Sequence, residues 1–327
     1  MLRKGIVVAM LLVFVLAAVG CGGTQKTEAP KFPTKAISII VPFAAGGGTD
    51  AVARSIAKYA EPVFGQPVTV VNKVGANGAT GMTEGVNSPA DGYMVTMVTV
   101  ETVTNPIQGN VKWKPTDFKA VMQVNSDASA VTVPVDSPFK TLQDLLKAAK
   151  EKPGTLKVGT VAPGAIWHTA GLGLQEKADV KFNLVPYPGG AAPIITDLLG
   201  GHLDATTVSA AEVSQHVKAG KLRILAVLAP ERLKGFPNIP TAKEQGVDVA
   251  VATWRGLAVP AKTPDAVVKT LHDGFKKSMD DPKFIEFMEK GNFGMTYRDS
   301  AGFQKYMDEQ TKFFEPLLQK AGLTKKQ

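Results

Sequence analysis

A short apolar run that leads into a glycine-rich turn and then into a helical pattern is the feature that most constrains this chain. The run Ile37–Val41 ends at Pro42, a glycine-rich turn occupies residues 44–50, and apolar side chains then recur at helical spacing from Val52. The same succession returns several times along the sequence. Alternating strands and helices of this kind predict α/β layers with largely parallel strands.

Further apolar runs and helical patterns complete this prediction. Strands are expected at residues 68–71, 94–98, 131–133, 156–160, 182–185, 205–208, 222–228 and 253–259. Helices are expected after Gly81, at 141–150 with Thr141 as the cap, at 168–175, around Pro193, and at 264–279, 282–290 and 300–318.

The length of 327 residues and the restart of the pattern after residue 124 indicate two lobes. One lobe is predicted to contain residues 36–124 plus 253–327, and the other residues 125–252. The connecting strands are expected near 123–127 and 250–255.

The first 20 residues are typical of a secretory signal peptide. Arg3 and Lys4 precede an apolar run over residues 6–19, which is short for a transmembrane helix. The run ends in Ala18-Val19-Gly20-Cys21, which resembles a bacterial lipobox. We expect Cys21 to be acylated and residues 21–35 to tether the protein to the membrane; the alternative is an ordinary signal peptide with an incidental cysteine. Cys21 is the only cysteine, so an internal disulfide is excluded.

Composition and motifs argue against several classes of function. The formal charge of +8 is scattered, without a basic stripe that carries interleaved aromatic residues, so no nucleic-acid partner is expected. Walker, complete dinucleotide-binding and G-x-S-x-G motifs are missing, and the four histidines lack metal-binding spacing. We therefore expect no metal, no cofactor and no enzyme activity, although catalytic groups can converge from distant loops.

Three loops rich in Gly, Pro, Thr and Ala precede helices and are the candidate binding elements. A helix N-terminus offers unpaired N–H groups and a partial positive charge, and glycine lets a ligand approach the backbone closely. In open α/β sheets, ligands bind at the carboxyl ends of the strands. The candidate ligand-binding residues are Phe43, Ala44, Ala45, Gly46, Gly47, Gly48, Thr49, Asp50, Gly159, Thr160, Ala162, Gly164, His168, Tyr187, Gly189, Gly190 and Ala191.

Each candidate also has a purely structural interpretation. The first loop could be a tight turn with Thr49 or Asp50 as the helix cap, although three successive glycines favour the approach of a ligand. A lone histidine such as His168 is more often a packed or capping side chain than a ligand contact.

Near the expected crossing strand, at most one of Trp254 and Arg255 should face the cleft, because adjacent strand residues point to opposite sides. Asp204 is expected to fix a loop rather than to contact an anion.

None of the three loops contains Lys or Arg, so backbone N–H groups are expected to hold an anion, with Arg255 as the one cation that could reach in. A bulky side chain at Gly47, as in Gly47→Val, should then block binding.

The run 39–50 followed by Ala53-Arg54 resembles the signature of the Bug family, the extracytoplasmic receptors of tripartite tricarboxylate transporters. The likeness continues at residues 65–68, 71–73, 75–78, 91–93, 185–187, 219–222 and 225–227. The resemblance implies a two-lobed, type II Venus-flytrap fold. It also implies that loops 43–50 and 159–168 grip one carboxylate of a small organic acid through backbone amides, hydroxyls and bridging waters.

The implied protein is a monomeric, membrane-anchored lipoprotein outside the cytoplasm that delivers a carboxylate to membrane permease subunits. Departures from the family pattern at Thr160, at Ala162-Pro163 and at Thr207-Val208 leave the ligand's identity open. The sequence also leaves open whether the cell has an outer membrane. The competing interpretations are a sensory binding protein and an exported α/β enzyme that acts on an acidic substrate.

Overall fold

The computed structural model describes residues 32–325, and the residues from Pro33 onward form one compact unit. The predicted signal peptide, Cys21 and most of the predicted tether lie outside the described residues. Within residues 32–325, none of the helices combines the length and the apolar character needed to cross a membrane.

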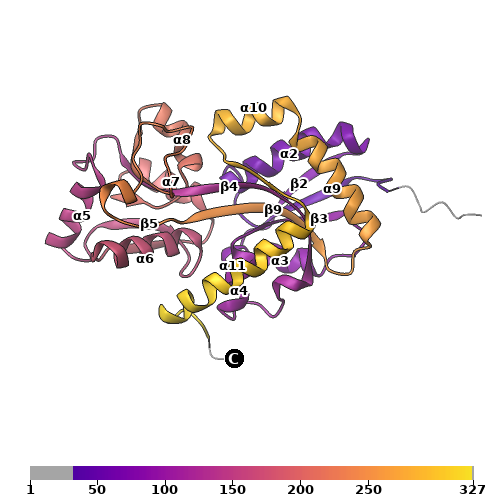
Figure 1. Ribbon diagram of the computed structural model, residues 1–327, viewed down its shortest axis with the longest axis horizontal. Helices are drawn as coiled ribbons and strands as arrows, with labels where there is room; N and C mark the ends of the chain where they lie inside the picture. Colours follow the sequence, from indigo (N-terminus) through magenta and orange to yellow (C-terminus); the bar gives the residue numbers. More distant parts are fainter. Residues whose placement is uncertain (1–31, 326–327) are drawn as a thin grey trace, which may run out of the picture. The chain divides into compact units, whose positions relative to one another are not determined.

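The first group of strands begins with a parallel core that continues into antiparallel neighbours (Figure 1). Strand β1 (Ile37–Val41) lies parallel between β2 (Val68–Asn72) and β3 (Met94–Thr99). Strand β9 (Ala252–Pro260) is antiparallel to β3 and to the long strand β4 (Phe118–Pro134).

The second group of strands is built on the later part of β4. Strand β5 (Lys157–Val161) lies parallel between β6 (Asn183–Tyr187) and β7 (Ala205–Thr206). Both β7 and β8 (Leu222–Leu228) are antiparallel to β4.

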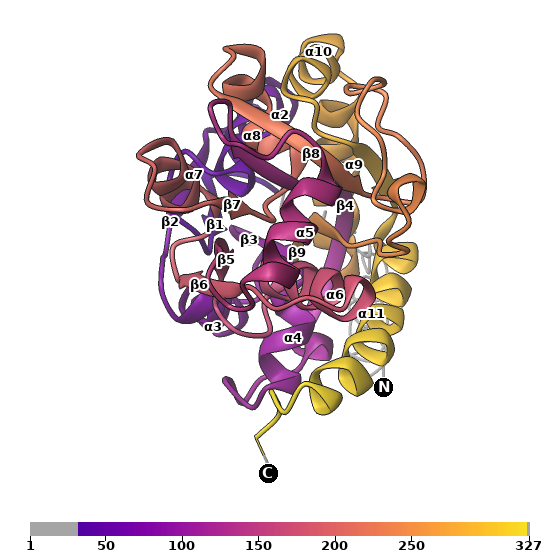
Figure 2. The same cartoon turned by 90° about the vertical axis from the view of Figure 1, so that its left-hand side faces the viewer.

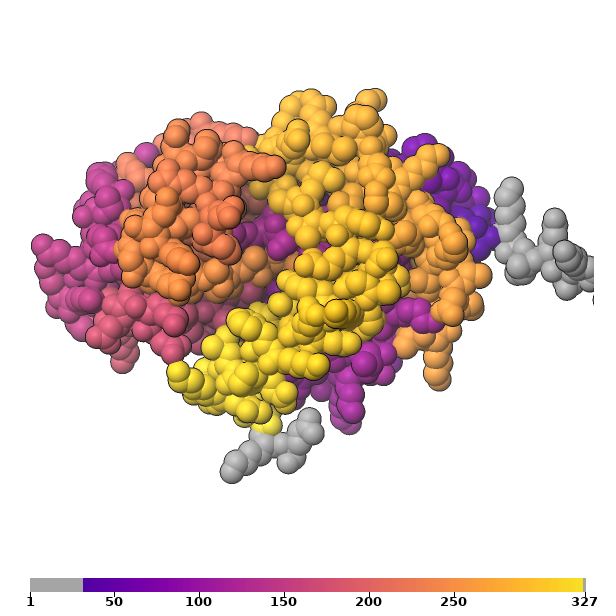
Figure 3. Space-filling model, in the orientation of Figure 1, coloured from indigo at the N-terminus to yellow at the C-terminus, as the bar shows by residue number. Residues whose placement is uncertain are grey.

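Ten α-helices of the described chain pack around these strands (Figures 1 and 2). Those associated with the first group of strands are α2 (Gly48–Phe64), α3 (Ala79–Val86), α4 (Glu101–Ile107), α9 (Asp265–Met279), α10 (Pro282–Gly291) and α11 (Ser300–Lys320). Those associated with the second group are α5 (Leu142–Glu151), α6 (Ile166–Ala178), α7 (Ala191–Leu199) and α8 (Ala210–Lys218). The C-terminal segment, in yellow, lies across the face shown in Figure 3, where α11 packs against α4 and β4.

Strands β4 and β9 run through both groups, and Figure 1 shows them side by side between the two sets of helices. Asn125 pairs with Arg255, and Asp127 pairs with Thr253, so the two segments expected to cross between lobes are hydrogen-bonded neighbours. The predicted lobe boundaries themselves stay a prediction.

Most of the predicted elements are confirmed within a few residues, including the cap of α5. The Thr141 hydroxyl accepts a hydrogen bond from the Asp144 N–H at 3.2 Å, and the Asp144 carboxylate accepts one from the Thr141 N–H at 2.9 Å. This reciprocal capping box is the pattern that a threonine followed by an acidic residue at the third helical position favours.

Four elements of the fold differ from the prediction. Strand β4 starts at Phe118 rather than 131, because buried polar residues such as Gln123 and Asn125 interrupt the apolar pattern of its first half. Helix α4 and helix α8 were not predicted, and neither was the short strand β10 (Met295–Arg298), which pairs with β4. The sheet is therefore mixed, since every pairing that involves β4 or β9 is antiparallel.

Candidate ligand-binding site

Three helices of nine or more residues begin at one small cavity, and the seven-residue α4 also starts there, at Glu101. Its lining includes Gly48 and Thr49 at the start of α2, Ile166 and Trp167 at the start of α6, and Ala191 at the start of α7. The first N–H groups of a helix have no intrahelical partner, and the helix dipole adds partial positive charge there. The cavity therefore collects backbone groups suited to an anion, although its volume of about 30 Å³ is that of only one or two water molecules.

The first loop places Gly47, rather than Thr49 or Asp50, at the N-cap of α2. Asp50 instead fixes the loop, because its carboxylate accepts hydrogen bonds from the Gly46 N–H (3.0 Å), Arg54 Nε (3.0 Å) and Asn72 Nδ2 (2.9 Å). Burial opposes ionisation of Asp50, but these donors and the Arg54 charge hold the pKa of its carboxyl below the ordinary value.

The second loop is held by two side-chain hydrogen bonds. His168 Nδ1 accepts a hydrogen bond from the Gly164 N–H at 3.2 Å, and Nε2 of Gln108, the residue that follows α4, donates to the Pro163 carbonyl at 2.8 Å. Burial lowers the pKa of His168, which favours the neutral imidazole that this accepting role requires. His168 thus fixes the loop that precedes α6, which is a structural role, and its contact with a ligand stays a prediction.

The third loop contacts the first. The Ala44 N–H donates to the Gly189 carbonyl at 3.3 Å, and Gly190 has a φ of 89° and lies beside the Phe43 ring. Tyr187 points elsewhere, since its hydroxyl donates to Asp197 Oδ2 at 2.5 Å. Burial and the Asp197 carboxylate raise the pKa of Tyr187 to about 12.

The structure brings about half of the predicted residues to the cavity. Those that line it are Phe43, Ala44, Gly47, Gly48, Thr49, Gly189, Gly190 and Ala191. Those that lie outside its lining are Ala45, Gly46, Asp50, Gly159, Thr160, Ala162, Gly164, His168 and Tyr187. Gly159 is packed against the Leu203 and Ile194 side chains, and the Thr160 hydroxyl donates to the Val161 carbonyl at 3.0 Å. Contact of any of these residues with a ligand stays a prediction.

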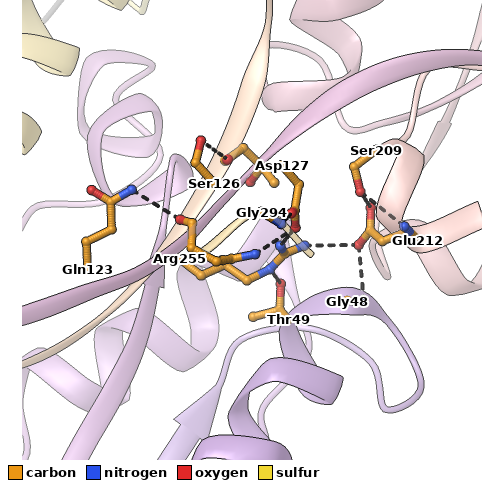
Figure 4. Close-up of polar contacts among 11 residues, drawn as sticks. Gly48, Thr49, Gln123, Ser126, Asp127, Ser209, Glu212, Arg255 and Gly294 are labelled. Atoms are coloured by element: carbon orange, nitrogen blue, oxygen red, sulfur yellow. Dashed lines mark hydrogen bonds and ion pairs between the residues drawn. The ribbon is translucent and has the colours of Figure 1, made fainter. Parts of the chain in front are cut away.

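Arg255 on β9 is the charged centre of the cavity (Figure 4). Its side chain is 2% exposed, its Nε donates to Thr49 Oγ1 at 2.9 Å, and its guanidinium pairs with Asp127 and with Glu212 Oε1, the latter at 3.2 Å. The neighbouring Trp254 packs edge-to-face on Phe303 at 5.4 Å between ring centroids. As expected from strand geometry, one of the two residues faces the cavity.

Asp127 anchors Arg255 from the side of β4. Its carboxylate also accepts hydrogen bonds from Asn125 Nδ2 and from the Gly294 N–H, both at 2.8 Å. Burial raises the pKa of Asp127, and the Arg255 charge and these hydrogen bonds act in the opposite direction.

Two buried glutamates that the sequence interpretation missed also line the cavity. Glu212 Oε1 accepts a hydrogen bond from the Gly48 N–H at 3.2 Å, and its Oε2 accepts one from Ser209 Oγ at 3.0 Å. Glu101 Oε1 accepts from the Ile166 N–H at 3.3 Å, and its Oε2 accepts from Thr99 Oγ1 at 2.5 Å. Burial is the largest effect on both carboxyls and raises the pKa of each.

The described side chains offer no set of ligands for a metal ion. The part of the chain that the structure describes holds no cluster of three or more His, Cys, Asp or Glu side chains placed to bind a metal ion.

Comparison with known proteins identifies the family. A family model described as tripartite tricarboxylate transporter family receptor matches residues 52–323. The chain belongs to the tripartite tricarboxylate transporter receptor family. As a receptor of this family the protein is extracytoplasmic, which agrees with the Bug-family resemblance of the sequence.

Several known sequences and solved structures are similar to this receptor over most of its length. The UPF0065 protein in the gbd 5′ region of Cupriavidus necator is 32% identical over 303 residues, covering 92% of each chain. The structure of the periplasmic binding protein BugD is 29% identical, with a TM-score of 0.84 over 90% of this chain and 100% of that chain. A protein of R. palustris solved with adipate is 25% identical, with a TM-score of 0.85 over 89% of this chain and 99% of that chain. The receptor therefore has the α/β fold of periplasmic binding proteins.

The receptor also has a larger cavity, of about 550 Å³, beside the crossing strands. It is lined by Asp127, Lys234, Phe236, Glu289 and Phe293, among others. No helix of the described chain starts in this lining except α8, which contributes Ala211. The smaller cavity is the better candidate for an acid, because helix N-termini and Arg255 converge there.

A sequence signal could have pointed to Glu212, one of the two glutamates that the sequence interpretation missed. Ser209 and Glu212 have the spacing of a helix cap and its third helical residue, and the Ser209 hydroxyl does accept a hydrogen bond from the Glu212 N–H at 3.3 Å. Glu101 has no comparable signal, since it starts a seven-residue helix rich in threonine that also contains Pro106.

Proposed function

We propose that the protein captures a small organic acid in the cavity at the start of α2, α6 and α7 and delivers it to the permease subunits of a tripartite transporter. The observation that carries the proposal is the convergence of the N-termini of α2, α6 and α7 and one buried arginine on a single cavity. Membership of the receptor family and the adipate named for a solved relative support it. In this proposal the protein binds its ligand without turning it over.

Backbone donors are expected to supply most of the affinity. Loops 43–50, 159–168 and 187–193 contain no Lys or Arg, and Arg255 is already engaged by Asp127 and Glu212. A hydrogen bond to a charged group contributes about 1.5–3 kcal/mol net, and a helix terminus adds about 0.3–1 kcal/mol. Four or five such contacts are enough for a micromolar site, about −8 kcal/mol, after ordering costs.

Ligand entry requires the cavity to open. Small-molecule sites usually measure about 300–1,000 Å³, far more than the cavity described here. We propose that residues 36–124 plus 253–327 and residues 125–252 form two lobes that move about β4 and β9. X-ray scattering should show a smaller radius of gyration on addition of a saturating acid, and an unchanged radius with binding confirmed would exclude closure.

We further propose that the protein is a monomer tethered to the membrane through an acylated Cys21. The support is the lipobox-like sequence that ends the apolar leader. In a bacterial host, the wild-type protein should sediment with membranes and Cys21→Ala should be released. Equal solubility of the two proteins would contradict acylation.

Calorimetry tests the central proposal. Acetate, succinate, succinamate, citrate, glutamate and glutamine are titrated into the folded protein at neutral pH, with glucose and choline as ligands that lack a carboxylate. We expect micromolar binding of at least one acid and none of glucose or choline. The absence of binding by every acid would contradict the proposal, whether or not glucose or choline binds.

A further inference from the structure

Each of the two buried glutamates reaches across the cavity to the start of a helix on the other side. Glu101 begins α4, which packs near β3, and it accepts the first N–H of α6 beside β5. Glu212 lies on α8, which packs against β8, and it accepts the first N–H of α2 beside β1. Side-chain carboxylates of the protein thus occupy two of the backbone donors that face the cavity.

The start of α7 differs from the starts of α2 and α6. Helix α7 begins at Ala191 after Gly190, both residues line the cavity, and within the described chain no side chain caps this helix. Helix α7 has nine residues, enough for its N-terminal dipole to act on an anion. One carboxylate position therefore stays open where the other two are filled by glutamate.

The lining of the cavity holds more acidic than basic side chains. Arg255 is the only Lys or Arg among the described residues that line it, whereas Glu101 and Glu212 are both part of the lining. Arg255 is also paired with Asp127, which is buried behind it. A ligand that brought two or three carboxylates would add like charge to a buried site that already holds more carboxylates than cations.

Both glutamates can accept further hydrogen bonds. An ionised carboxylate has about four acceptor positions. Glu101 receives donors from Thr99 and Ile166, and Glu212 receives donors from Gly48, Ser209 and Arg255. The acceptor positions that remain next to the cavity are complementary to N–H donors of a ligand.

We infer that Glu101 and Glu212 are specificity-determining residues that take the place of ligand carboxylates. The site then selects an organic acid with one carboxylate and a nitrogen group that donates N–H bonds, an ammonium or an amide, and it disfavours di- and tricarboxylates. The single carboxylate is expected at the start of α7, with the nitrogen group facing the glutamates. The inference rests on the proposed function, because it assumes that an acid binds in this cavity.

Pairs of nearly isosteric probes test the inference without identifying the natural ligand. Glutamine and glutamate, asparagine and aspartate, and succinamate and succinate each differ by an amide in place of a carboxylate. Calorimetry at neutral pH on the full wild-type protein should give at least tenfold tighter binding of the amide in at least one pair. Equal or tighter binding of the dicarboxylate in every pair would overturn the inference and leave the proposed function intact.

Variants then test whether the two glutamates cause the preference for the amide over the dicarboxylate. Glu101→Gln and Glu212→Gln each replace a carboxyl group by an amide, so the preference for the amide probe over its dicarboxylate partner should fall severalfold toward one. Glu286→Gln is the matched control, because Glu286 is a surface residue of α10 paired with Lys290, and its ratio should stay at the wild-type value. An unchanged ratio in both cavity variants would remove the glutamates from the selection.

Two further outcomes are decisive. If no acid of the panel binds, the proposed function fails and this inference fails with it. If a glutamine variant does not fold, the wild-type ratio and the other variant still decide, because the wild-type measurement depends on no substitution.

Discussion

Single atoms decide how closely the residues of the cavity approach one another. A Cβ at Gly48 would lie 2.8 Å from Arg255 Nη2 and 2.8 Å from Glu212 Cγ, whereas a Cβ at Gly47 would meet only the Ala44 carbonyl at 3.6 Å. The sequence indicated that a glycine of this run allows close approach, and it singled out Gly47. That role of Gly47 toward a ligand stays a prediction. Close approach by the protein's own side chains occurs at Gly48, and these side chains come from residues 164 and 207 positions away.

We predict that Gly48→Ala destabilises the protein and that Gly47→Ala does not. The new methyl group at Gly48 must displace the Arg255 and Glu212 side chains, and overpacking of this kind costs about 1–3 kcal/mol. Gly47 is only partly buried and has room for a methyl group, so its change should stay within about 0.5 kcal/mol. Urea unfolding of both variants measures the difference, and equal stabilities would show that the contacts around Gly48 are not tight.

A second prediction at this scale concerns pH. Burial raises the pKa of Glu101 above its ordinary value of 4.5, against weaker opposing effects of Thr99, the Ile166 N–H and the Arg255 charge. Because the folded protein then binds the proton more tightly than the unfolded chain, the contribution of Glu101 to stability is fully present below pH 4.5. It is lost as the pH rises through the folded pKa.

Glu101→Gln should therefore flatten the decline of unfolding free energy above pH 4.5. Asp127 and Glu212 shift in the same direction, so part of the slope should persist. Urea unfolding at a series of pH values compares the two proteins. Parallel profiles over this range would mean that Glu101 is not perturbed by burial.

At the scale of elements, the sequence predicted the strands and helices that are determined by a local residue pattern. It did not predict those that depend on tertiary contacts. Strands β1 and β8 are apolar runs interrupted only by Ser38 and Arg223, respectively, and were located to the residue. Helix α4 is seven residues long and depends on packing against α11, so its local sequence predicts little. The polar first half of β4 is stable because its partners, such as Gly294 and Arg255, come from the end of the chain.

The candidate site shows the same division. Glycine-rich loops that precede helices were visible in the sequence, and all three contribute residues to the cavity or lie directly beside it. Glu101 and Glu212 were missed because they lie on α4 and α8, the two α-helices that were not predicted. Which N–H group each glutamate meets depends on how α2 and α6 pack against elements far away in the sequence, and no local pattern encodes that.

At the scale of the whole molecule, β4 and β9 connect the two groups of elements and carry the charged centre between them. Asp127 on β4 and Arg255 on β9 pair with each other, and Arg255 also contacts Thr49 of α2 and Glu212 of α8. A ligand that changed the separation of α2 and α8 would act directly on this ion-pair network. The crossing strands are therefore the expected place where binding is coupled to lobe movement.

The most direct test of this account is a crystal structure of the protein with the tightest-binding acid of the panel. We predict that its carboxylate accepts hydrogen bonds from N–H groups at the start of α7, in the cavity that contains Arg255. The rival position is the larger cavity of about 550 Å³ lined by Lys234 and Phe293. An acid bound there, with the helix starts around Arg255 unoccupied, would contradict the proposed binding site.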